Sequence, residues 1–447
     1  MYATLRQHLS FAATVLFILF SPPVVGQVIN EDEKIIPSDG FQQDFFGESV
    51  SMSGNIAVLG ARLDDTNGLD SGSAYLFHIS TGQKSWKLLA NDGASLDQFG
   101  QSVAVNGTTV VVGSPWDDDN GPESGSVYLF DSITGQQTAK LLPDDGSSND
   151  FFGYSVAISE TNIIVGGRSG SVYLFDSTTG QQLFKLLPTD GAEGNQFGEA
   201  LAIHGNLAVV GAEFDDDNGT NSGAVYVFDA STGHQIMKIY PSDGASRDFF
   251  GRSVAINSSY IVVGAPGDDD NGSGSGSAYL FNATTLQQVS KLLPVDGMVG
   301  DRFGESISIS GNRVVIGART RDESDIDSGA AFVFDTTTGK QIAMLLPSDG
   351  AERDEFGTSV GVSGNKIVVG ASEDDDNGFA SGSGYIFSIP SLCPPDLNND
   401  GSLNFFDVSA YLTAYATNDP AADFNNDGEF NFFDVSAFLV AYLAGCP

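Results

Sequence analysis

Cysteine, histidine and basic side chains are scarce in this chain of 447 residues. Two cysteines and four histidines are too few for metal chemistry that needs clusters of thiolates or imidazoles. Only 19 basic residues face 58 acidic ones, so the formal net charge is −39 at pH 7. A surface this negative repels phosphate backbones and anionic lipid heads, and we therefore expect neither nucleic-acid binding nor electrostatic attachment to membranes.

Long apolar runs are also rare, and the run at the N-terminus is short. Residues 11–20 are largely apolar, follow Arg6 and His8, and end before a Pro-Pro pair. This pattern is typical of a secretory signal, whereas a membrane span needs about 20 apolar residues. We predict that residues 1–26 are a signal peptide cleaved near Gly26 and Gln27, that the protein is secreted or associated with the cell surface, and that it has no membrane span.

Glycine, in contrast, is abundant, with 54 residues, and it marks an internal repeat. A Phe-Gly pair recurs at intervals of 53 residues, with one interval of 45. Each unit contains four strand-like segments, which in the second unit are 102–105, 109–113, 126–130 and 138–143. Four antiparallel strands per ~50 residues are typical of a propeller blade, so seven units predict an all-β, seven-bladed propeller over residues 27–390. The glycines of the seven pairs are Gly47, Gly100, Gly153, Gly198, Gly251, Gly304 and Gly357.

The phase of the repeat predicts how the ring closes. The segment 34–40, KIIPSDG, matches the fourth-strand segment 140–146, KLLPDDG, of the second unit. The seventh unit, in turn, stops after its third strand at 384–387. We therefore expect an N-terminal strand to complete the last blade, which would leave no open sheet edge.

These units resemble the FG-GAP repeats of integrin α-chain propellers and of many secreted bacterial proteins. The resemblance rests on Phe-Gly followed about 13 residues later by Val-Gly-Ala, as in Phe250-Gly251 and Val263-Gly264-Ala265. It spans residues 34 to about 390 and implies the propeller fold. It implies little about activity, because fold alone does not determine function.

Six units carry an acidic loop between their second and third strands. Alternating oxygen ligands ahead of a glycine suit Ca²⁺, and the resemblance to integrin-type cages makes these loops candidate metal sites. An Asx-type turn without metal is the alternative. The third unit lacks the loop, so a blade needs no cation there to fold. The candidate propeller ligands are Asp65, Asn67, Asp118, Asn120, Asp216, Asn218, Asp269, Asn271, Asp375 and Asn377.

No catalytic motif is visible, and we expect no enzyme. The sequence has neither a GxSxG elbow nor an HExxH motif. The sequence leaves open whether two carboxylates, as a glycosidase needs, face each other at the centre of the ring. Residues that interrupt the repeat are the better candidates for a unique site, with ordinary loop variation as the alternative. They are Arg62, Trp86, Trp116, Arg168, Arg319 and Arg321.

The last part of the chain, residues 391–447, contains two near-copies that begin at Asp396 and Asp423. Each starts with oxygen-bearing residues at positions one, three, five, nine and twelve around a glycine, a pattern typical of a Ca²⁺ loop, and an apolar helical pattern follows each loop. We predict two bound Ca²⁺ ions and a small α-helical domain. The ligands of the first loop are Asp396, Asn398, Asp400, Ser402 (through its carbonyl), Asn404 and Asp407; those of the second are Asp423, Asn425, Asp427, Glu429 (carbonyl), Asn431 and Asp434.

Such paired loop–helix units look like a dockerin, a tandem half EF-hand domain. The resemblance implies docking onto a cohesin-like or other surface protein. Phenylalanines occupy loop positions ten and eleven, at Phe405, Phe406, Phe432 and Phe433, where they could face a partner or form the core. Cys393 and Cys446 bracket the domain, and in an exported protein such a pair predicts a disulfide.

Taken together, these features favour a secreted, non-enzymatic binding or adhesion protein. Its propeller would present a recognition surface to a protein or polysaccharide, and its dockerin-like tail would dock in a Ca²⁺-dependent manner. Two alternatives stay open: a carbohydrate-active component of a dockerin-organised extracellular complex, and a structural surface-layer protein.

Overall fold

The computed structural model describes residues 27–81, 83–191, 194–389, 395–397, 403–417, 419, 422–425 and 429–445. The predicted signal peptide, the cysteine pair and four of the predicted Ca²⁺ ligands lie outside these residues. The four ligands are Asn398, Asp400, Ser402 and Asp427.

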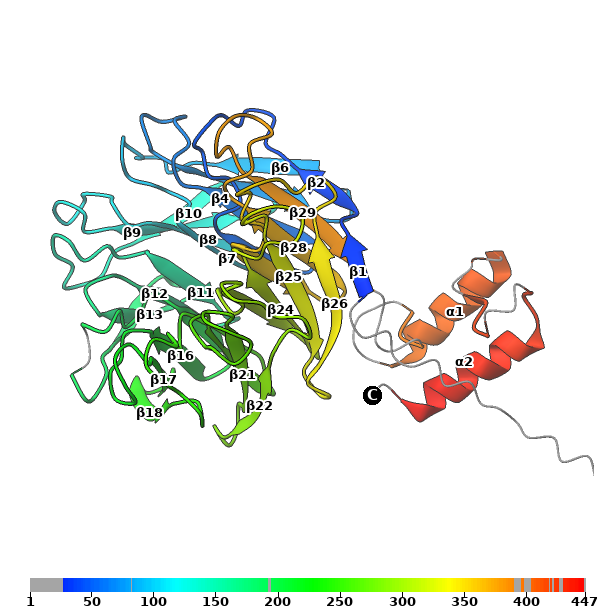
Figure 1. Ribbon diagram of the computed structural model, residues 1–447. Coiled ribbons are helices and arrows are strands. Elements are labelled where there is room, and N and C mark those ends of the chain that lie inside the picture. The colour runs from blue at the N-terminus through cyan, green and yellow to red at the C-terminus, as the bar shows by residue number, and fades with distance from the viewer. Residues whose placement is uncertain are drawn as a thin grey trace, which may run out of the picture.

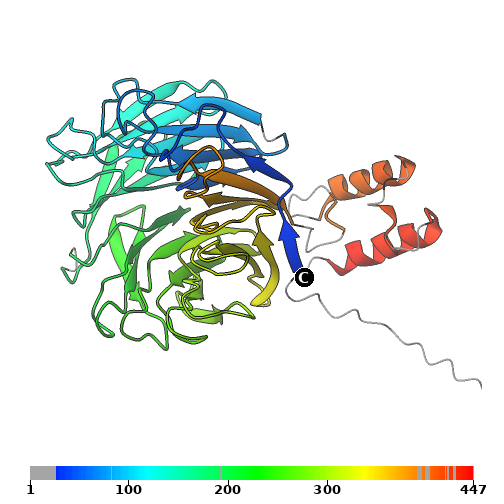
Figure 2. The same ribbon diagram turned by 45° about the horizontal axis from the view of Figure 1, so that its top comes forward.

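Seven sheets, six with four strands and one with five, form the blades of a closed propeller (Figures 1 and 2), and the repeat predicts the four antiparallel strands of each. Within each blade the strand that follows the Phe-Gly pair lines the central channel, and the next strands lie progressively further out. Blades 1 to 3 consist of β3 (Val50–Ser53), β4 (Ile56–Ala61), β5 (Ser73–His78) and β6 (Gln83–Leu88); β7 (Ser102–Asn106), β8 (Thr109–Ser114), β9 (Ser126–Asp131) and β10 (Gln137–Leu141); and β11 (Ser155–Ile158), β12 (Asn162–Gly166), β13 (Val172–Asp176) and β14 (Gln182–Leu186).

The remaining blades repeat this order. Blades 4 and 5 consist of β15 (Leu201–His204), β16 (Leu207–Ala212), β17 (Ala224–Asp229) and β18 (His234–Ile239); and β19 (Ser253–Ile256), β20 (Tyr260–Ala265), β21 (Ser277–Asn282) and β22 (Gln288–Leu292). Blades 6 and 7 contain β23 (Ser306–Ser310), β24 (Arg313–Ala318), β25 (Ala330–Asp335) and β26 (Lys340–Leu346); and β27 (Ser359–Ser363), β28 (Lys366–Ala371) and β29 (Ser383–Ser388).

The core lies between neighbouring blades. The second strands are continuous apolar runs, such as Val110, Val111 and Val112, because each blade is covered on both faces and every residue of the run is buried. A single apolar cluster joins Val209 of blade 4 to Val263 of blade 5. The blades therefore stabilise one another and not only themselves.

The Phe-Gly pair is a packing unit. Phe99 is buried and meets the rings of Tyr128 and Phe130 edge-on, with centroids 5.5 and 5.7 Å apart. Gly100 has a φ of +98°, and a Cβ atom there would lie 2.2 Å from the carbonyl oxygen of Ser73. Only glycine fits this close approach, which explains why the pair recurs in every unit.

An N-terminal strand closes the ring, as predicted. Strand β2 (Glu33–Ile35) pairs antiparallel with β29, with Lys34 opposite Tyr385 and Ile35 opposite Gly384. Figure 1 shows β2 beside β29 in the last blade. A further strand, β1 (Gln27–Asn30), pairs in parallel with β26 as a fifth strand of blade 6, and the repeat does not predict it.

Two helices follow the propeller, α1 (Phe405–Thr417) and α2 (Phe432–Ala444), and they lie on the side of β1 and β26 (Figures 1 and 2). The rings of Tyr411 and Phe438 stack between them with centroids 4.0 Å apart. Asn431 caps α2 and forms a capping box with Asp434. Both helices have 13 residues, and within the described chain no helix has the length and apolar character that crossing a membrane requires.

We expect the closing strand to dominate propeller stability. Ile35 is 3% exposed, so Ile35→Ala should lower the free energy of unfolding by about 2–5 kcal/mol. Val28 of β1 is 48% exposed, and Val28→Ala is the matched control, with an expected change within about 0.5 kcal/mol. Urea unfolding followed by tryptophan fluorescence measures both, since both tryptophans lie in the propeller. Equal effects of the two substitutions would contradict the closure argument.

Candidate functional site

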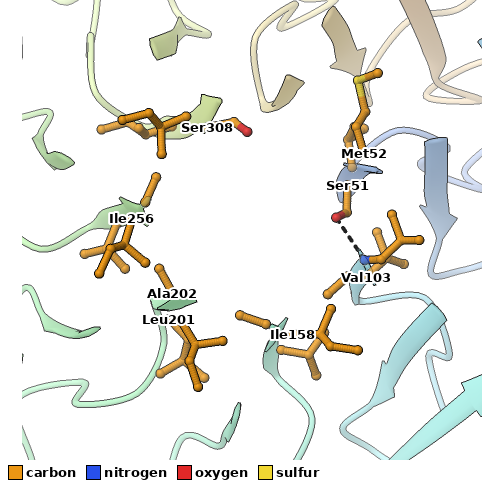
Figure 3. Close-up of a pocket in the computed structure, with 18 of the residues that line it drawn as sticks. Ser51, Met52, Val103, Ile158, Leu201, Ala202, Ile256 and Ser308 are labelled. Carbon is orange, nitrogen blue, oxygen red and sulfur yellow. Dashed lines mark hydrogen bonds between the residues drawn. The ribbon is translucent and has the colours of Figure 1, made fainter. Parts of the chain in front are cut away.

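The propeller axis is a narrow apolar channel. It is lined by the innermost strands and encloses about 250 Å³. Figure 3 shows Met52, Ile158, Leu201 and Ile256 around it, with Ser51 and Ser308 as hydroxyl-bearing members. No side chain lining this cavity is an acid, a base or a cysteine. The channel itself therefore offers no acid–base pair.

One mouth of the channel has a different chemistry. The residue after each Phe-Gly pair and the loops after each second strand meet there, and charged and aromatic side chains surround the opening. We call the following set the collar. It consists of Glu48, Arg62, Trp116, Phe151, Tyr154, Arg168, Glu199, Glu213, Arg252, Arg302, Glu305, Arg319 and Glu355.

Ion pairs run from blade to blade around part of the collar. Arg252 bridges two blades, with Nε 2.9 Å from Glu305 Oε1 and Nη1 3.0 Å from Glu213 Oε1. Arg302 Nε lies 2.9 Å from Glu305 Oε2, and Arg319 Nη1 lies 2.8 Å from an oxygen of Glu355. These guanidinium groups link blades 4 to 7 into one network. Two further ion pairs lie at the same mouth. Arg62 pairs with Glu48 within blade 1, and Arg168 of blade 3 pairs with Glu199 of blade 4.

The network separates the pKa values of its carboxyl groups. Burial by itself would raise the pKa of Glu305, but the guanidinium groups of Arg252 and Arg302, with that of Arg319, outweigh burial and lower it. Burial raises the pKa of Glu213 and of Glu48, because the one close arginine beside each carboxyl group does not outweigh the effect of burial. Glu305 is thus the most firmly ionised of the three.

Aromatic rings form the rest of the collar. Trp116 meets Phe151 edge-on at 5.7 Å and lies 6.4 Å from Tyr154. The Arg168 guanidinium lies over the Tyr154 ring, 4.6 Å from its centroid, a favourable cation–π geometry. The opening therefore has an aromatic arc on blades 2 and 3 and an ionic arc on the others.

The structure divides the residues that interrupt the repeat into two groups. Arg62, Trp116, Arg168 and Arg319 all belong to the collar, although they are far apart in sequence. Trp86 does not, because its Nε1 donates to the carbonyl of Ile133 at 3.3 Å and its ring covers Gly135 of the next blade. Arg321 lies in the acidic loop of blade 6.

Sequence reasoning missed Glu213, Arg252, Arg302 and Glu305, which a comparison of the positions flanking each Phe-Gly pair and each second strand could have found.

The acidic loops have extensive hydrogen bonds of their own. Each candidate aspartate ligand accepts a hydrogen bond from a backbone N–H five residues ahead, for example Asp118 Oδ1 from Glu123 at 2.8 Å. Asn67 and Asn271 donate their side-chain amides to backbone carbonyls of the neighbouring turn. The other candidate aspartates that accept from the N–H five residues ahead are Asp65, Asp216, Asp269 and Asp375. The Asx-type turn is made by the aspartate before each candidate aspartate, as where Asp117 Oδ1 accepts from the Asp119 N–H at 3.1 Å.

In blades 1, 2, 5, 6 and 7 an aspartate two residues before the Phe-Gly pair is buried beside the loop. Burial is the main cause that raises its pKa to about 6 in four blades, with backbone N–H groups opposing and the loop carboxylates adding to the effect. In blade 4 an asparagine, Asn195, takes this position and donates its amide to Asp215 Oδ2 at 3.2 Å. A protonated aspartate could donate in the same direction. The four aspartates are Asp44, Asp97, Asp248 and Asp354.

Among the predicted Ca²⁺ ligands that the structure describes, Asn404 and Asp407 lie at the start of α1, and Asn431 and Asp434 lie at the start of α2. Asp396, Asp407 and Asp434 are buried. One oxygen of Asp434 accepts from the Asn431 N–H at 2.8 Å and the other from the Asn425 N–H at 3.3 Å, so the second loop folds around this carboxylate. Carboxylate oxygens are among the ligands that Ca²⁺ takes in proteins.

The four phenylalanines of this region do not form its core. Phe405, Phe406, Phe432 and Phe433 are 75, 68, 74 and 68% exposed. The core consists instead of Tyr411, Ala422 and Phe438 with partly buried neighbours. The two helices therefore present an apolar surface to solvent.

The buried aspartates make propeller stability depend on pH. A raised pKa in the folded state means that protonation stabilises folding, so this stability is complete below about 4 and is lost as pH rises through about 6. We expect the Tm of the propeller to rise by several degrees when the pH falls from about 7.5 to about 5. Replacing all four aspartates by asparagine should remove most of this rise, while Asn195→Asp should enlarge it. Thermal unfolding by tryptophan fluorescence measures the shifts; an unchanged rise in the fourfold variant would refute the assignment.

Comparisons with known proteins concern the propeller. A family model described as FG-GAP repeat matches residues 29–77, 83–130, 136–175, 181–228, 234–281, 286–334 and 340–387. No curated protein matches the chain. Among solved structures, a crystal structure of the computationally designed Ika8 protein is similar with a TM-score of 0.48 and 19% identity, over 81% of this chain and 100% of that chain. Because the repeat model matches every blade and more than half of the residues, the chain belongs to the FG-GAP repeat family.

Proposed function

We propose that this protein is a secreted, non-enzymatic binding or adhesion protein that recognises a ligand at the collar and docks through its C-terminal helices. FG-GAP propellers are typical of binding proteins, which supports the general class. The observation that carries the proposal is the gathering of the residues that vary between blades around one mouth of the channel. Four of the six residues that interrupt the repeat lie at the collar, and variation concentrated on one surface of a repetitive scaffold favours recognition there.

The collar has the composition of a recognition surface. Tryptophan, tyrosine and arginine supply large contact areas and directed hydrogen bonds. Arginines and glutamates alternate, so the collar can both donate and accept hydrogen bonds within a chain whose net charge is −39. These properties suit a protein segment or a polysaccharide as the ligand.

The second surface lies where the chain leaves the propeller. Strand β29 begins at the acidic loop, on the collar side, and ends at Ser388 on the opposite side. Arg313 lies at the start of β24 on that opposite side and interacts electrostatically with Asp396. A partner bound to the helices would therefore leave the collar accessible.

Exposed apolar side chains at equivalent positions of the two helices support docking. The Phe-Phe pair recurs at the start of α1 and of α2, and Leu412 and Leu439 are both exposed further along. Contiguous exposed apolar surface favours a protein partner. We propose a cohesin-like or other surface protein, with Ca²⁺ holding the loops; Asp396, Asp407, Asp423 and Asp434 would be among the ligands.

Of the two alternatives, the carboxyl groups of the collar bear most directly on the carbohydrate-active enzyme. A glycosidase needs two carboxyl groups free to reach one bond. In the collar, Glu213 and Glu305 are both held by Arg252, and Glu48 is held by Arg62. This arrangement favours binding over cleavage.

Retention and cleavage by the full chain test the recognition proposal. We expect the protein to be retained on at least one component of a panel of polysaccharides and cell-envelope fractions without releasing soluble product. Trp116→Ala combined with Arg168→Ala should weaken retention roughly tenfold. Met237→Ala, on the exposed outer strand of blade 4, is the control and should bind like the wild type. Product release would support the enzyme alternative, and self-assembly into sheets the surface-layer alternative.

Removal of Ca²⁺ should unfold the C-terminal helices and leave the propeller intact. The carboxylates that hold the loops repel one another without a cation, and this small domain has little other core. We expect chelator to reduce the helical signal in circular dichroism while tryptophan fluorescence stays constant. Asp407→Asn with Asp434→Asn should mimic chelator, and Asp419→Asn, outside the loops, should not. Helices unchanged in chelator would contradict the Ca²⁺ assignment.

A further inference from the structure

One lysine of the outermost strand reaches into the acidic loop of five blades. In blade 4, Lys238 Nζ lies 2.8 Å from Asp190 Oδ2, 2.7 Å from Asp215 Oδ2 and 2.8 Å from Asp217 Oδ2. Asp190 comes from the turn before the blade, and the other two come from the loop between the second and third strands. The equivalent lysines are Lys34, Lys87, Lys140 and Lys291.

The ammonium group occupies a position suited to a metal ion. Asp190, Asp215 and Asp217 each offer an oxygen, and these oxygens lie within 4.8 Å of one another, a spacing that could hold a cation. Lys238 Nζ is within hydrogen-bond distance of all three. Tyr226 also donates to Asp215 Oδ2, at 3.2 Å. A tetrahedral ammonium with three donors satisfies three carboxylates at once.

Blade 6 reaches the same result with different residues. Arg321 stands where the other loops have the buried aspartate, and Met344 stands where the other blades have lysine. The Arg321 guanidinium lies 2.9 Å from Asp296, 2.8 Å from Asp301 and 2.8 Å from Glu323. A cation is thus retained at this place although the loop, and not the strand, supplies it.

Blade 3 shows what remains when the loop is absent. Lys185 keeps an ion pair of 2.7 Å with Asp145 of the preceding turn, and Tyr173 donates to the same carboxylate. No loop carboxylate completes the cluster, because residues 167–171 connect the strands directly. The lysine therefore finds three carboxylates only in described blades that have the loop, and in blade 1 the hydroxyl of Thr66 takes the place of the third carboxylate.

We infer that the chain's own ammonium and guanidinium groups are the cations of the propeller loops, and that these loops take no Ca²⁺. A divalent ion on the same oxygens would lie only a few ångströms from a fixed positive charge, which is strongly unfavourable in a partly buried site. The integrin-type resemblance leads one to expect Ca²⁺ here, and the residues do not fit it. The candidate ligands Asp65 and Asp118 are, in addition, already bonded to loop N–H groups.

The C-terminal loops provide the contrast within one chain. Beyond Lys366 the sequence contains no lysine or arginine. No side chain of that domain supplies a permanent positive charge to its buried aspartates. Arg313 of the propeller interacts with the charge of Asp396, and an external cation is the counter-charge that we propose for the loops themselves. The same chain therefore neutralises its two sets of acidic loops in two ways.

Lys238→Met in the full chain tests the inference, since methionine is the residue that blade 6 has at this position. The wild-type propeller transition, followed by tryptophan fluorescence, should be the same in chelator and in millimolar Ca²⁺. In Lys238→Met the Tm should fall by about 2–5 °C in chelator and recover when Ca²⁺ is added. Equilibrium dialysis should find one more Ca²⁺ per chain in the variant than in the wild type.

Lys185→Met is the matched control, because blade 3 has no loop carboxylates to bind the ion. It should lower Tm slightly and show no response to Ca²⁺. A wild-type propeller that Ca²⁺ stabilises, or a Lys238→Met chain that binds no additional ion, would overturn the inference. Lys291→Met repeats the test if Lys238→Met does not fold. The C-terminal loops are the same in the variant and the wild type, so the difference in bound Ca²⁺ between the two does not depend on them. Failure of the proposed C-terminal Ca²⁺ sites would therefore be recognised separately.

Discussion

The pairing of β2 with β29 is the constraint on which the rest of the propeller depends. Every blade buries its faces against two neighbours, so a ring with an incomplete last blade would expose apolar surface on two sides. Ile35 belongs to the cluster that contains Tyr75 of blade 1 and Ile386 of blade 7, and it therefore joins the two ends of the repeat. The collar spans this closure as well, because Glu48 of blade 1 lies close enough to Arg319 and Glu355 on the other side of the junction for their charges to act on its pKa.

The sequence predicted the blades well because their constraints are local. Phe99 and Gly100 must pack and turn in the same way in each unit, and the alternation of the strands follows from burial on both faces. Closure was also predictable, since a strand surplus at one end matched a deficit at the other. Strand β1 was not predictable. It has four residues, lies outside the repeat and pairs in parallel with the outer edge of blade 6, so neither the repeat nor a hairpin turn marks it in the sequence.

The collar and the lysine clusters were only partly predictable, for a different reason. Lys238 is 48 residues from Asp190 and 23 from Asp215, and only the stacking of blades brings them together. The sequence shows an acidic loop and a lysine in a strand, and nothing in their spacing connects them. Arg62, Trp116, Arg168 and Arg319 stood out because they interrupt a pattern. Arg252 and Glu305 occupy a position that varies in every unit, so neither looked exceptional until the ring placed them side by side.

The distribution of positive charge explains how so acidic a chain stays folded. Self-repulsion destabilises a compact state with many unpaired carboxylates. Eight of the nine lysines lie on the fourth strands of the blades, where most reach the densest acidic clusters. Five of the ten arginines lie in the collar, each beside a glutamate. Much of the positive charge of the propeller is therefore placed where its carboxylates are densest. The C-terminal domain has no lysine or arginine. Under the proposal that its loops bind Ca²⁺, its stability would depend on ions in the surroundings, and docking through it would respond to those ions while recognition at the collar would not.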